Sequence, residues 1–369
     1  MVAARVALVH DWLNQIGGAE AVLEVLVRLF PDAPVFTTIY ARELMPDHYR
    51  SWDIRTTFLD RAPGIYRHHQ HYLPLYPLAV ESMCLQGYDL VLSNKSGFCH
   101  GIRKTDNQLH IDYCLTPTRY VWDFAGYAER ERLGLAARLA LRPLVDWLRA
   151  WDRRAADRVD HFVAISTEVQ QRIKRFYGRD STIIYPPVDT HRHCPSPDGP
   201  ESFFLVASRL IPYKRIDLAV RACSALSVPL VVVGEGRDRS TLEAIAGPTV
   251  EFRGRVSSEE LGWLMSHCRA FVFPGREDFG IAPVEAQAAG RPVIAFAAGG
   301  ALDTVIPSET GVFFSEQTVD SLVEAILSLD RITFDPAIVR ENAERFGIER
   351  FGRQFLQFVA TAWRNYASN

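Results

Sequence analysis

Short apolar runs alternate along the chain with longer segments in which apolar residues recur at helical spacing. Runs of strand length occupy residues 6–10, 35–39, 88–92, 109–115 and 161–165 in the first half, and residues 203–207, 229–233, 250–254, 270–273 and 292–296 in the second. Helical periodicity is clearest over residues 19–30, 166–177, 219–226 and 346–366. Strands that alternate with helices predict parallel sheets covered by helices, so the expected fold class is α/β.

A proline-rich segment divides the chain. Residues 181–202, STIIYPPVDTHRHCPSPDGPES, contain five prolines, and proline interrupts helices and central strands alike. A chain of 369 residues is also long enough for about two domains, each with its own core. We therefore predict a first domain over residues 1–184, a linker over 185–198 and a second domain over 199–345.

The composition indicates a soluble globular protein, with 48% apolar and 23% charged residues. No apolar run reaches the roughly 18 residues of a membrane helix, and the start MVAARVALVHDW indicates a first strand instead of a signal peptide, so we expect a cytoplasmic location. The six cysteines lack zinc-site or C-x-x-C spacing. His68, His69 and His71 lack a carboxylate or cysteine partner at fixed spacing, and we predict no metal.

Charge is distributed unevenly between the halves. The net charge of −3 gives no reason to expect nucleic acid as a partner. Residues 130–160, however, carry eight arginines against five acidic residues, and Trp147 and Trp151 lie one helical turn apart. This pattern is typical of an amphipathic helix on an anionic membrane, and equally of one that packs on a core. Contact with the inner face of the cell membrane through the first domain stays open.

Candidate chemistry is densest at residues 274–296, PGREDFGIAPVEAQAAGRPVIAF, where a short helix connects two predicted strands. Gly280 opens the helix, and amides at a helix N-terminus can bind an anion. Glu277 lies on the preceding loop and Glu285 about one turn inside the helix. Carboxylates accept hydrogen bonds from sugar hydroxyls, so this combination indicates a nucleotide-sugar site. Two glutamates at this spacing also occur by chance.

Two other connections carry groups suited to a diphosphate. Gly17 and Gly18 lie in the loop between the first strand and the first helix, where the backbone can approach a ligand, although such a pair is also a common turn. Arg209 and Lys214 come from one connection close to the start of a helix. Two cations near amide donors would clamp a diphosphate, whereas solvated surface charges would give the same pattern.

These motifs together resemble those of the retaining family-four glycosyltransferases. The resemblance covers residues 5 to about 350 and rests on VHDWL with GGAE, YCLTPTRYVWD, RVDHFVAIS, IYPPVD, ASRLIPYKR and GREDFGIAPVEA. It implies the GT-B fold, in which two Rossmann-like domains with parallel sheets face each other across a cleft. The first domain would bind the acceptor and the second the donor. A C-terminal helix, about 346–369, would cross back to the first domain.

The resemblance also implies roles for individual residues. Arg209 and Lys214 would stabilise the departing diphosphate, Glu277 would orient the sugar, and Glu285 would hold the ribose. The candidate acceptor-side groups are His10 and Asp11. Further donor contacts are expected from Gly17, Gly18, Gly234, Val256, Phe279, Gly280, Ile281 and Leu115. Because the chain has no D-x-D triplet, we expect no metal and no cofactor beyond the nucleotide-sugar substrate.

The implied reaction is retaining transfer of a hexose from a nucleotide diphosphate sugar to a hydroxyl of a glycan or lipid-linked glycan. The subgroup with HDWL and TPTRYVWD resembles bacterial mannosyltransferases of surface-polysaccharide and O-antigen assembly, which favours GDP-mannose or a 6-deoxy relative as donor. A UDP- or dTDP-sugar-dependent transferase is an alternative. So are a nucleotide-sugar 2-epimerase of the same architecture and a non-catalytic nucleotide-sugar-binding protein.

Leu115 is a departure from the family pattern, which commonly has histidine at this position, near the 6-hydroxyl of the donor sugar. Leucine cannot hydrogen-bond a hydroxyl but would pack against a methyl group, so a 6-deoxyhexose donor such as GDP-rhamnose or GDP-fucose is expected. Two alternatives stay open: His110 or His100 replaces the imidazole, or Leu115 faces the core.

Overall fold

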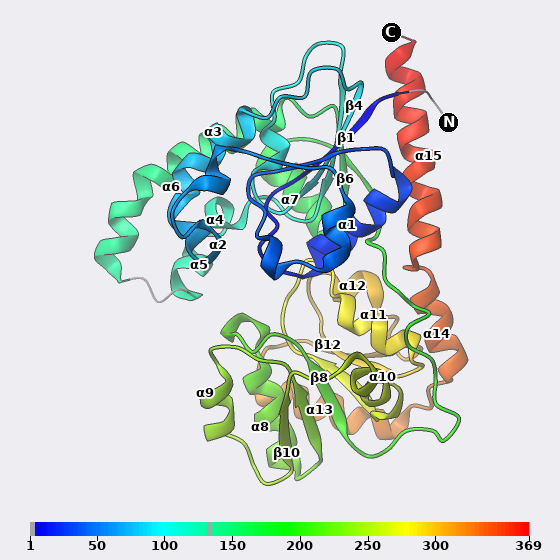
Figure 1. The fold of residues 1–369 in the computed structure, drawn as a ribbon. Coiled ribbons are helices and arrows are strands. Elements are labelled where there is room, and N and C mark those ends of the chain that lie inside the picture. Colours follow the sequence, from blue (N-terminus) through cyan, green and yellow to red (C-terminus); the bar gives the residue numbers. More distant parts are fainter. Residues whose placement is uncertain (1–3, 131–133, 369) are drawn as a thin grey trace. The chain divides into compact units, whose positions relative to one another are not determined.

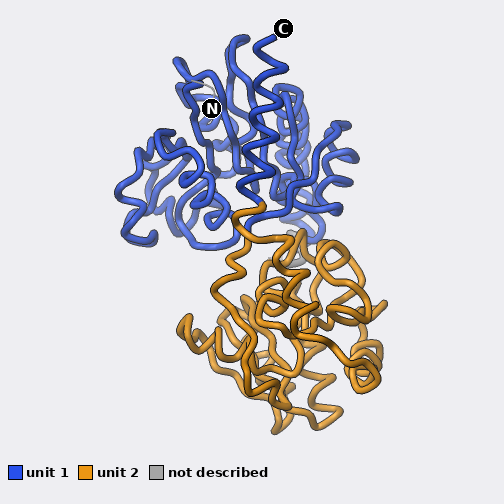
Figure 2. Tube along the Cα trace, turned by 90° about the vertical axis from the view of Figure 1, so that its right-hand side faces the viewer, with its two compact units in different colours: residues 1–187, 351–369 blue, residues 188–350 orange. Residues whose placement is uncertain are grey.

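The computed structural model describes residues 4–130 and 134–368. Residues 131–133 of the arginine-rich segment 130–160 lie outside the described residues. The chain forms two compact units, one made of the residues up to Pro187 together with those from Phe351 onward, and the other of Val188–Arg350 (Figure 2). The division after Pro187 falls within the segment predicted as a linker.

The first unit is built on a seven-stranded parallel sheet with the order β3-β2-β1-β4-β5-β6-β7. Its strands are β1 (Val6–His10), β2 (Val35–Thr37), β3 (Ile54–Thr56), β4 (Leu90–Lys95), β5 (Leu109–Cys114), β6 (His161–Ala164) and β7 (Ser181–Ile183). Its helices are α1 (Gly18–Leu29), α2 (Ile65–His68), α3 (Tyr76–Glu81), α4 (Arg119–Trp122), α5 (Phe124–Arg130), α6 (Leu135–Ala156), α7 (Thr167–Tyr177) and α15 (Ile348–Ala367), which begins at the end of the second unit.

The second unit has a six-stranded parallel sheet with the order β10-β9-β8-β11-β12-β13. Its strands are β8 (Phe204–Ala207), β9 (Leu230–Val233), β10 (Val250–Gly254), β11 (Ala270–Phe273), β12 (Val293–Phe296) and β13 (Gly311–Phe314). Its helices are α8 (Ile216–Leu226), α9 (Arg239–Ala244), α10 (Ser258–His267), α11 (Ile281–Ala288), α12 (Ala301–Thr304), α13 (Val319–Ser328) and α14 (Pro336–Glu344). The predicted pair of parallel α/β sheets is confirmed.

The C-terminal helix α15 returns to the first unit, where it lies beside the sheet (Figure 1). The rings of Phe351 and Phe355 meet the edge of Tyr113 on β5 at centroid distances of 5.5 and 5.8 Å. Near the other end of the helix, the Tyr366 hydroxyl donates to the Asp106 carbonyl. These contacts confirm that the last helix packs on the first domain, as predicted.

In each sheet the strand order reverses between two central neighbours, β1 and β4 in the first unit and β8 and β11 in the second. The loops that follow such a pair diverge at the carboxyl edge of the sheet and leave room for a ligand, which is where open α/β sheets bind their substrates. The loops after β1, β4, β8 and β11 are therefore the positions at which to look for chemistry.

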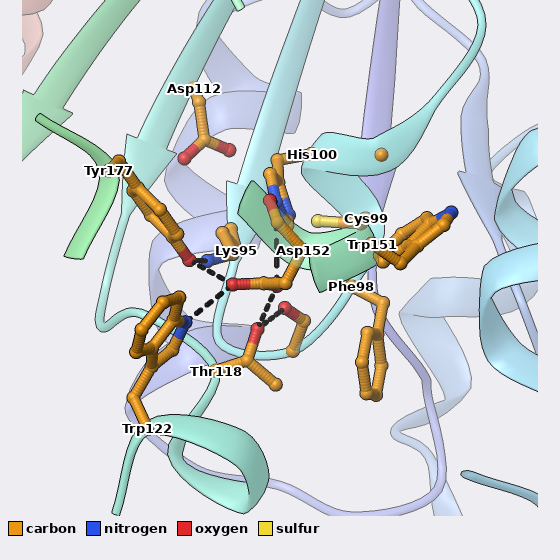
Figure 3. A network of polar contacts seen from close by, with 12 residues as sticks. Lys95, Phe98, Cys99, His100, Asp112, Thr118, Trp122, Trp151, Asp152 and Tyr177 are labelled. Atoms are coloured by element: carbon orange, nitrogen blue, oxygen red, sulfur yellow. Dashed lines mark hydrogen bonds and ion pairs between the residues drawn. The ribbon is translucent and has the colours of Figure 1, made fainter. Parts of the chain in front are cut away.

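A buried polar network ties the end of β4 to three helices of the first unit (Figure 3). The carboxylate of Asp152 on α6 accepts hydrogen bonds from the Thr118 hydroxyl, the Trp122 indole and the Tyr177 hydroxyl, each at 2.7 Å. The Tyr177 hydroxyl in turn accepts from the Lys95 ammonium at 2.5 Å. Burial alone would lower the pKa of Lys95, but Asp152 leads the neighbours that raise it, so the ammonium stays charged.

Asp112 on β5 is wholly buried, and its Oδ1 accepts a hydrogen bond from the Ser93 hydroxyl at 2.5 Å. Burial raises the pKa of Asp112 to about 7. The folded protein therefore holds a proton that the unfolded chain, with an aspartate pKa of about 3.9, has lost at neutral pH. The stability this proton supplies is complete below about pH 4 and is lost as the pH rises through about 7.

We expect Asp112→Asn to remove this pH dependence, because an amide cannot ionise. The free energy of unfolding, measured by urea denaturation between pH 5 and pH 8, should fall less steeply in the variant than in the wild type. Asp53→Asn is the matched control, because the Asp53 side chain is 58% exposed. Parallel curves for wild type and Asp112→Asn would show that the carboxyl is ionised throughout this range.

Candidate functional site

A hollow of about 320 Å³ lies at the carboxyl edge of the sheet in the second unit. It brings together three residues that the sequence predicted as donor contacts, namely Arg209 after β8, Gly234 after β9 and Glu285 on α11. Its remaining lining residues come from the ends of β8 and β9, from the loop after β10, and from α10 and α11: Ala207, Ser208, Val233, Glu235, Arg255, Leu261, Met265 and Ala282. Cationic and anionic side chains thus share one concave site.

Glycines allow the loops at this edge to touch one another. Gly234 has a φ of 124°, and a Cβ there would lie 1.9 Å from the carbonyl oxygen of Ser208. A Cβ on Gly299 would lie 2.3 Å from the carbonyl oxygen of Glu277, and the amide of Gly300 donates to the same oxygen at 2.8 Å. Gly299 and Gly300 therefore hold the backbone of the Glu277 loop, whereas Gly234 brings the loop after β9 against Ser208.

Lys214 and Glu277 form an ion pair across the point where the strand order reverses. Lys214 ends the turn after β8, Glu277 lies in the loop after β11, and their side chains are 13% and 20% exposed. The sequence suggested separate partners for the two residues, the diphosphate and the sugar. The structure shows that they contact each other, so any group that binds one of them also changes the surroundings of the other.

The start of α11 is shaped by Gly280, whose φ of 92° favours glycine. A Cβ at this position would come within 2.8 Å of the Phe273 ring, so the missing side chain makes room for a core residue. Phe279 was also predicted to contact the donor. Its ring is buried against Phe346, so only its main chain is available for that contact. Val256 and Ile281, also predicted as contacts, are both partly exposed.

Asp11 follows β1, and its side chain reaches the loop after β4. Its buried carboxylate accepts hydrogen bonds from the amides of Ser96, Gly97, Phe98 and Cys99 at 2.6–2.7 Å. Both oxygens are thereby engaged with the backbone. The predicted contact of this carboxylate with an acceptor would require these bonds to break, and the structure assigns Asp11 to holding the loop.

His10 ends β1 and is also buried. The side-chain amide of Asn94 lies 3.3 Å from its Nδ1, and its Nε2 lies 3.5 Å from Oε1 of Glu20 in the first turn of α1. Sequence reasoning did not identify Asn94 or Glu20. The signal was present in the GGAE motif, which places Glu20 just after the exposed Gly17 and Gly18.

Leu115 follows β5, and its amide donates to the carbonyl of Lys95 at 2.8 Å. The residue is 9% exposed, which leaves a small part of it accessible. His110 and His100 are completely buried and contact Ser93 and the Asp152 carbonyl respectively. Neither imidazole reaches the surface of the unit, so neither can take the place of a side chain at position 115.

No group of three or more histidine, cysteine, aspartate or glutamate side chains suited to a metal ion occurs in residues 4–130 and 134–368. The groups gathered at the two sheet edges are hydrogen-bond donors, cations and carboxylates. Such groups bind and orient phosphates and hydroxyls.

Two family models match consecutive parts of the chain. The first, "Glycosyltransferase Family 4", matches residues 16–192, and the second, "Glycosyl transferases group 1", matches residues 189–346. The two halves of the chain thus each match a glycosyltransferase family model. The division between the two models falls in the linker, close to the division between the two units of the chain.

Similar curated proteins include two mannosyltransferases. The "GDP-mannose-dependent alpha-mannosyltransferase" of Mycolicibacterium smegmatis is 36% identical over 202 residues, which is 52% of this chain and 51% of the relative. The "GDP-mannose-dependent alpha-(1-6)-phosphatidylinositol monomannoside mannosyltransferase" of Mycobacterium tuberculosis is 31% identical over 243 residues, 58% of this chain and 60% of the relative. The chain thus matches only 51% and 60% of the length of these two relatives.

Solved structures share the fold over nearly the whole chain. Sucrose-phosphate synthase from Thermosynechococcus elongatus superposes with a TM-score of 0.73 at 20% identity, covering 97% of this chain and 100% of that one. The lipopolysaccharide outer core galactosyltransferase WaaB gives 0.70 at 16% identity, covering 97% and 99%. The fold of the chain is therefore GT-B, as the sequence predicted.

Proposed function

We propose that the protein is a glycosyltransferase that moves a hexose from a GDP-linked sugar, GDP-mannose or its 6-deoxy relative, to a hydroxyl of a glycan or lipid-linked acceptor in polysaccharide assembly. The observation that carries the proposal is the convergence of Arg209, Lys214, Glu277 and Glu285 on one sheet edge. The GDP-mannose dependence in the names of two relatives supports the choice of donor.

The proposed roles follow from charge. Arg209, Lys214 and the amides at the start of α11 stabilise the negative charge that grows on the diphosphate as its bond to the sugar breaks. Glu277 then accepts hydrogen bonds from sugar hydroxyls, and Glu285 accepts them from the ribose. A diphosphate that arrives at Lys214 replaces Glu277 as its partner and leaves that carboxylate available for the sugar.

The acceptor proton goes to the departing phosphate in this mechanism. The acceptor oxygen attacks from the face that the diphosphate leaves, so the new bond keeps the anomeric configuration, and the leaving oxygen receives the proton. The bonding of Asp11 to four amides supports this route, since it leaves that carboxylate without a free lone pair for the acceptor. No step requires a metal ion.

The function is tested with labelled GDP-mannose and octyl α-mannoside as a soluble acceptor, in the presence of EDTA. A transferase releases GDP only when acceptor is present, and nuclear magnetic resonance of the product identifies the anomer. A 2-epimerase would change the sugar without acceptor, and a binding protein would leave it intact. Release of GDP that does not depend on any acceptor in a panel of mannosides and lipid-linked glycans would contradict the proposal.

Leu115→His is expected to shift donor preference toward GDP-mannose over GDP-rhamnose by about tenfold, because imidazole can hydrogen-bond the 6-hydroxyl whereas leucine packs on a 6-methyl. Competition between the two donors, in wild type and variant, measures the ratio. A ratio that does not change would show that Leu115 is a packing residue without donor contact.

We also propose that the first half of α6 contacts an anionic membrane surface at the inner face of the cell membrane. Leu135 and Leu139 are 74% and 50% exposed beside Arg138 and Arg142. The two tryptophans do not share this surface, since Trp147 is 44% exposed but Trp151 is buried and donates to Glu81. Among the described helices, none has the length and hydropathy to cross a bilayer.

Flotation with vesicles tests this contact. We expect binding to phosphatidylglycerol vesicles and little to phosphatidylcholine vesicles, since apolar burial and arginine charge act together. Leu135→Glu with Leu139→Glu should abolish it, and Leu302→Glu, at a leucine 58% exposed on α12, is the matched control. Equal binding to both vesicle types, or an unaffected double variant, would contradict the contact.

A further inference from the structure

His193 is buried in the segment that joins the two units and lies within the second. Its side chain is 0% exposed, and neither ring nitrogen has a hydrogen-bond partner among the residues that the structure describes. An unsatisfied buried polar group costs about 1–3 kcal/mol. An apolar side chain would avoid this cost, so the imidazole needs an explanation.

The backbone around His193 is fastened to α11, the helix that carries Glu285. Arg340 on α14 donates to the carbonyl oxygen of His193 at 2.8 Å and to that of Ala288, the last residue of α11, at 2.6 Å. Two residues after His193, the Pro195 side chain lies against Gly290, just beyond the helix. The backbone of His193 is therefore held in place relative to α11, which leaves only the side chain to adjust.

The imidazole lies next to the carboxylate proposed to bind ribose. Its Nε2 is 4.0 Å from Oε1 of Glu285, whose side chain is 21% exposed and lines the hollow. Burial lowers the pKa of His193, so the ring is neutral and one nitrogen carries a proton. Burial also raises the pKa of Glu285, whose carboxylate therefore gains from any donor that reaches it.

We propose that His193 is a positioning residue for nucleotide binding, which donates a hydrogen bond from Nε2 to Glu285 and turns the carboxylate toward the ribose hydroxyls. A side-chain movement of about 1 Å brings the two atoms to hydrogen-bond distance. An ionised carboxylate has about four acceptor sites, so it accepts from His193 and from both ribose hydroxyls at once. This inference rests on the role of Glu285 in the proposed function.

The test compares GDP with 2′,3′-dideoxy-GDP, which lacks both ribose hydroxyls, by calorimetry. His193→Phe fills the site with an apolar ring of similar size, His193→Gln keeps an N–H donor, and Glu285→Gln removes the charge. His191→Gln is the matched control, since this neighbouring histidine is 71% exposed.

We expect His193→Phe to bind GDP about tenfold more weakly than the wild type, the range of a hydrogen bond to a charged group, and to bind the dideoxy nucleotide equally well. Glu285→Gln should show the same selective loss, and His193→Gln should restore part of the GDP affinity. In kinetics, His193→Phe should raise KM for the donor and leave kcat unchanged. If the role of His193 were purely structural, the variant would bind both nucleotides more weakly and to the same extent.

Four results overturn the inference. If His193→Phe loses affinity for both nucleotides equally, His193 serves packing. If its affinity for GDP is unchanged, His193 is not part of the site. Neither result contradicts the proposed function. A wild type that binds GDP and its dideoxy form equally refutes the ribose contact of Glu285 as well. A wild type that binds neither GDP, UDP nor ADP refutes the proposed function and this inference together.

Discussion

Lys214→Ala is expected to lower kcat for hexose transfer about 10²–10³-fold, the typical effect of removing one preorganised donor from a site where charge develops. The ammonium is held beside Glu277 at the carboxyl edge of the sheet, where the proposed diphosphate leaves. Lys214 ends a short 3₁₀ turn, and its partner Glu277 is 20% exposed, so water can hydrate the carboxylate once the ammonium is removed and the free energy of unfolding should change little.

Initial rates with saturating GDP-mannose and acceptor give kcat, and thermal unfolding reports on the fold. Lys174→Ala is the matched control, since this lysine is 60% exposed and also pairs with one carboxylate, that of Asp180. Turnover within twofold of the wild type in Lys214→Ala would remove the residue from the reaction and move the diphosphate contact to Arg209 alone.

Asp152→Ala is expected to lower the free energy of unfolding by about 3–5 kcal/mol, the usual consequence of leaving a buried charge without its partner. The carboxylate accepts from Thr118, Trp122 and Tyr177. Its removal leaves these donors unpaired and takes away the charge that offsets the ammonium of Lys95 (Figure 3).

Urea denaturation measures the loss. Asp146→Ala on the same helix is the control, because this aspartate is 69% exposed and pairs with Arg149 at the surface. Combining Asp152→Leu with Lys95→Met should recover the part of the loss that comes from the unpaired ammonium, whereas Thr118, Trp122 and Tyr177 stay without their acceptor. A loss below about 1 kcal/mol in Asp152→Ala, the size of one ordinary hydrogen bond, would show that water enters the network.

The sequence predicted the central strands well where they are apolar, but the predicted strand 88–92 stops short of β4, which continues through Ser93, Asn94 and Lys95. It missed the strand β3, Ile-Arg-Thr, and the strand β7, Ser-Thr-Ile, which lie at the edges of their sheet and are partly exposed. These two edge strands bury little surface, so their composition differs little from that of loops. It also missed β13, an edge strand of the second sheet, which is mostly buried but only four residues long and begins with glycine.

The candidate site was predictable as a set of loops but not as a set of contacts. Glycine and charge spacing, together with the family resemblance of the surrounding motifs, identified the segments around Arg209, Glu277 and Glu285. Spacing could not show that Lys214 and Glu277, 63 residues apart, form one ion pair. Nor could it show that four amides occupy Asp11, because a loop backbone leaves no pattern in side chains.

The pairing of Lys214 with Glu277 also bears on how the product leaves. A nucleotide that binds Lys214 must displace a carboxylate already beside it, and the same carboxylate remains close enough to reclaim the ammonium afterwards. The attraction of Lys214 for an anion is thereby reduced to the difference in free energy between its pair with the anion and its pair with Glu277. A single phosphate with few other contacts therefore gains little binding free energy. The spent nucleotide, once it has lost its sugar, faces an internal competitor that shortens its residence and returns the protein to the start of its cycle.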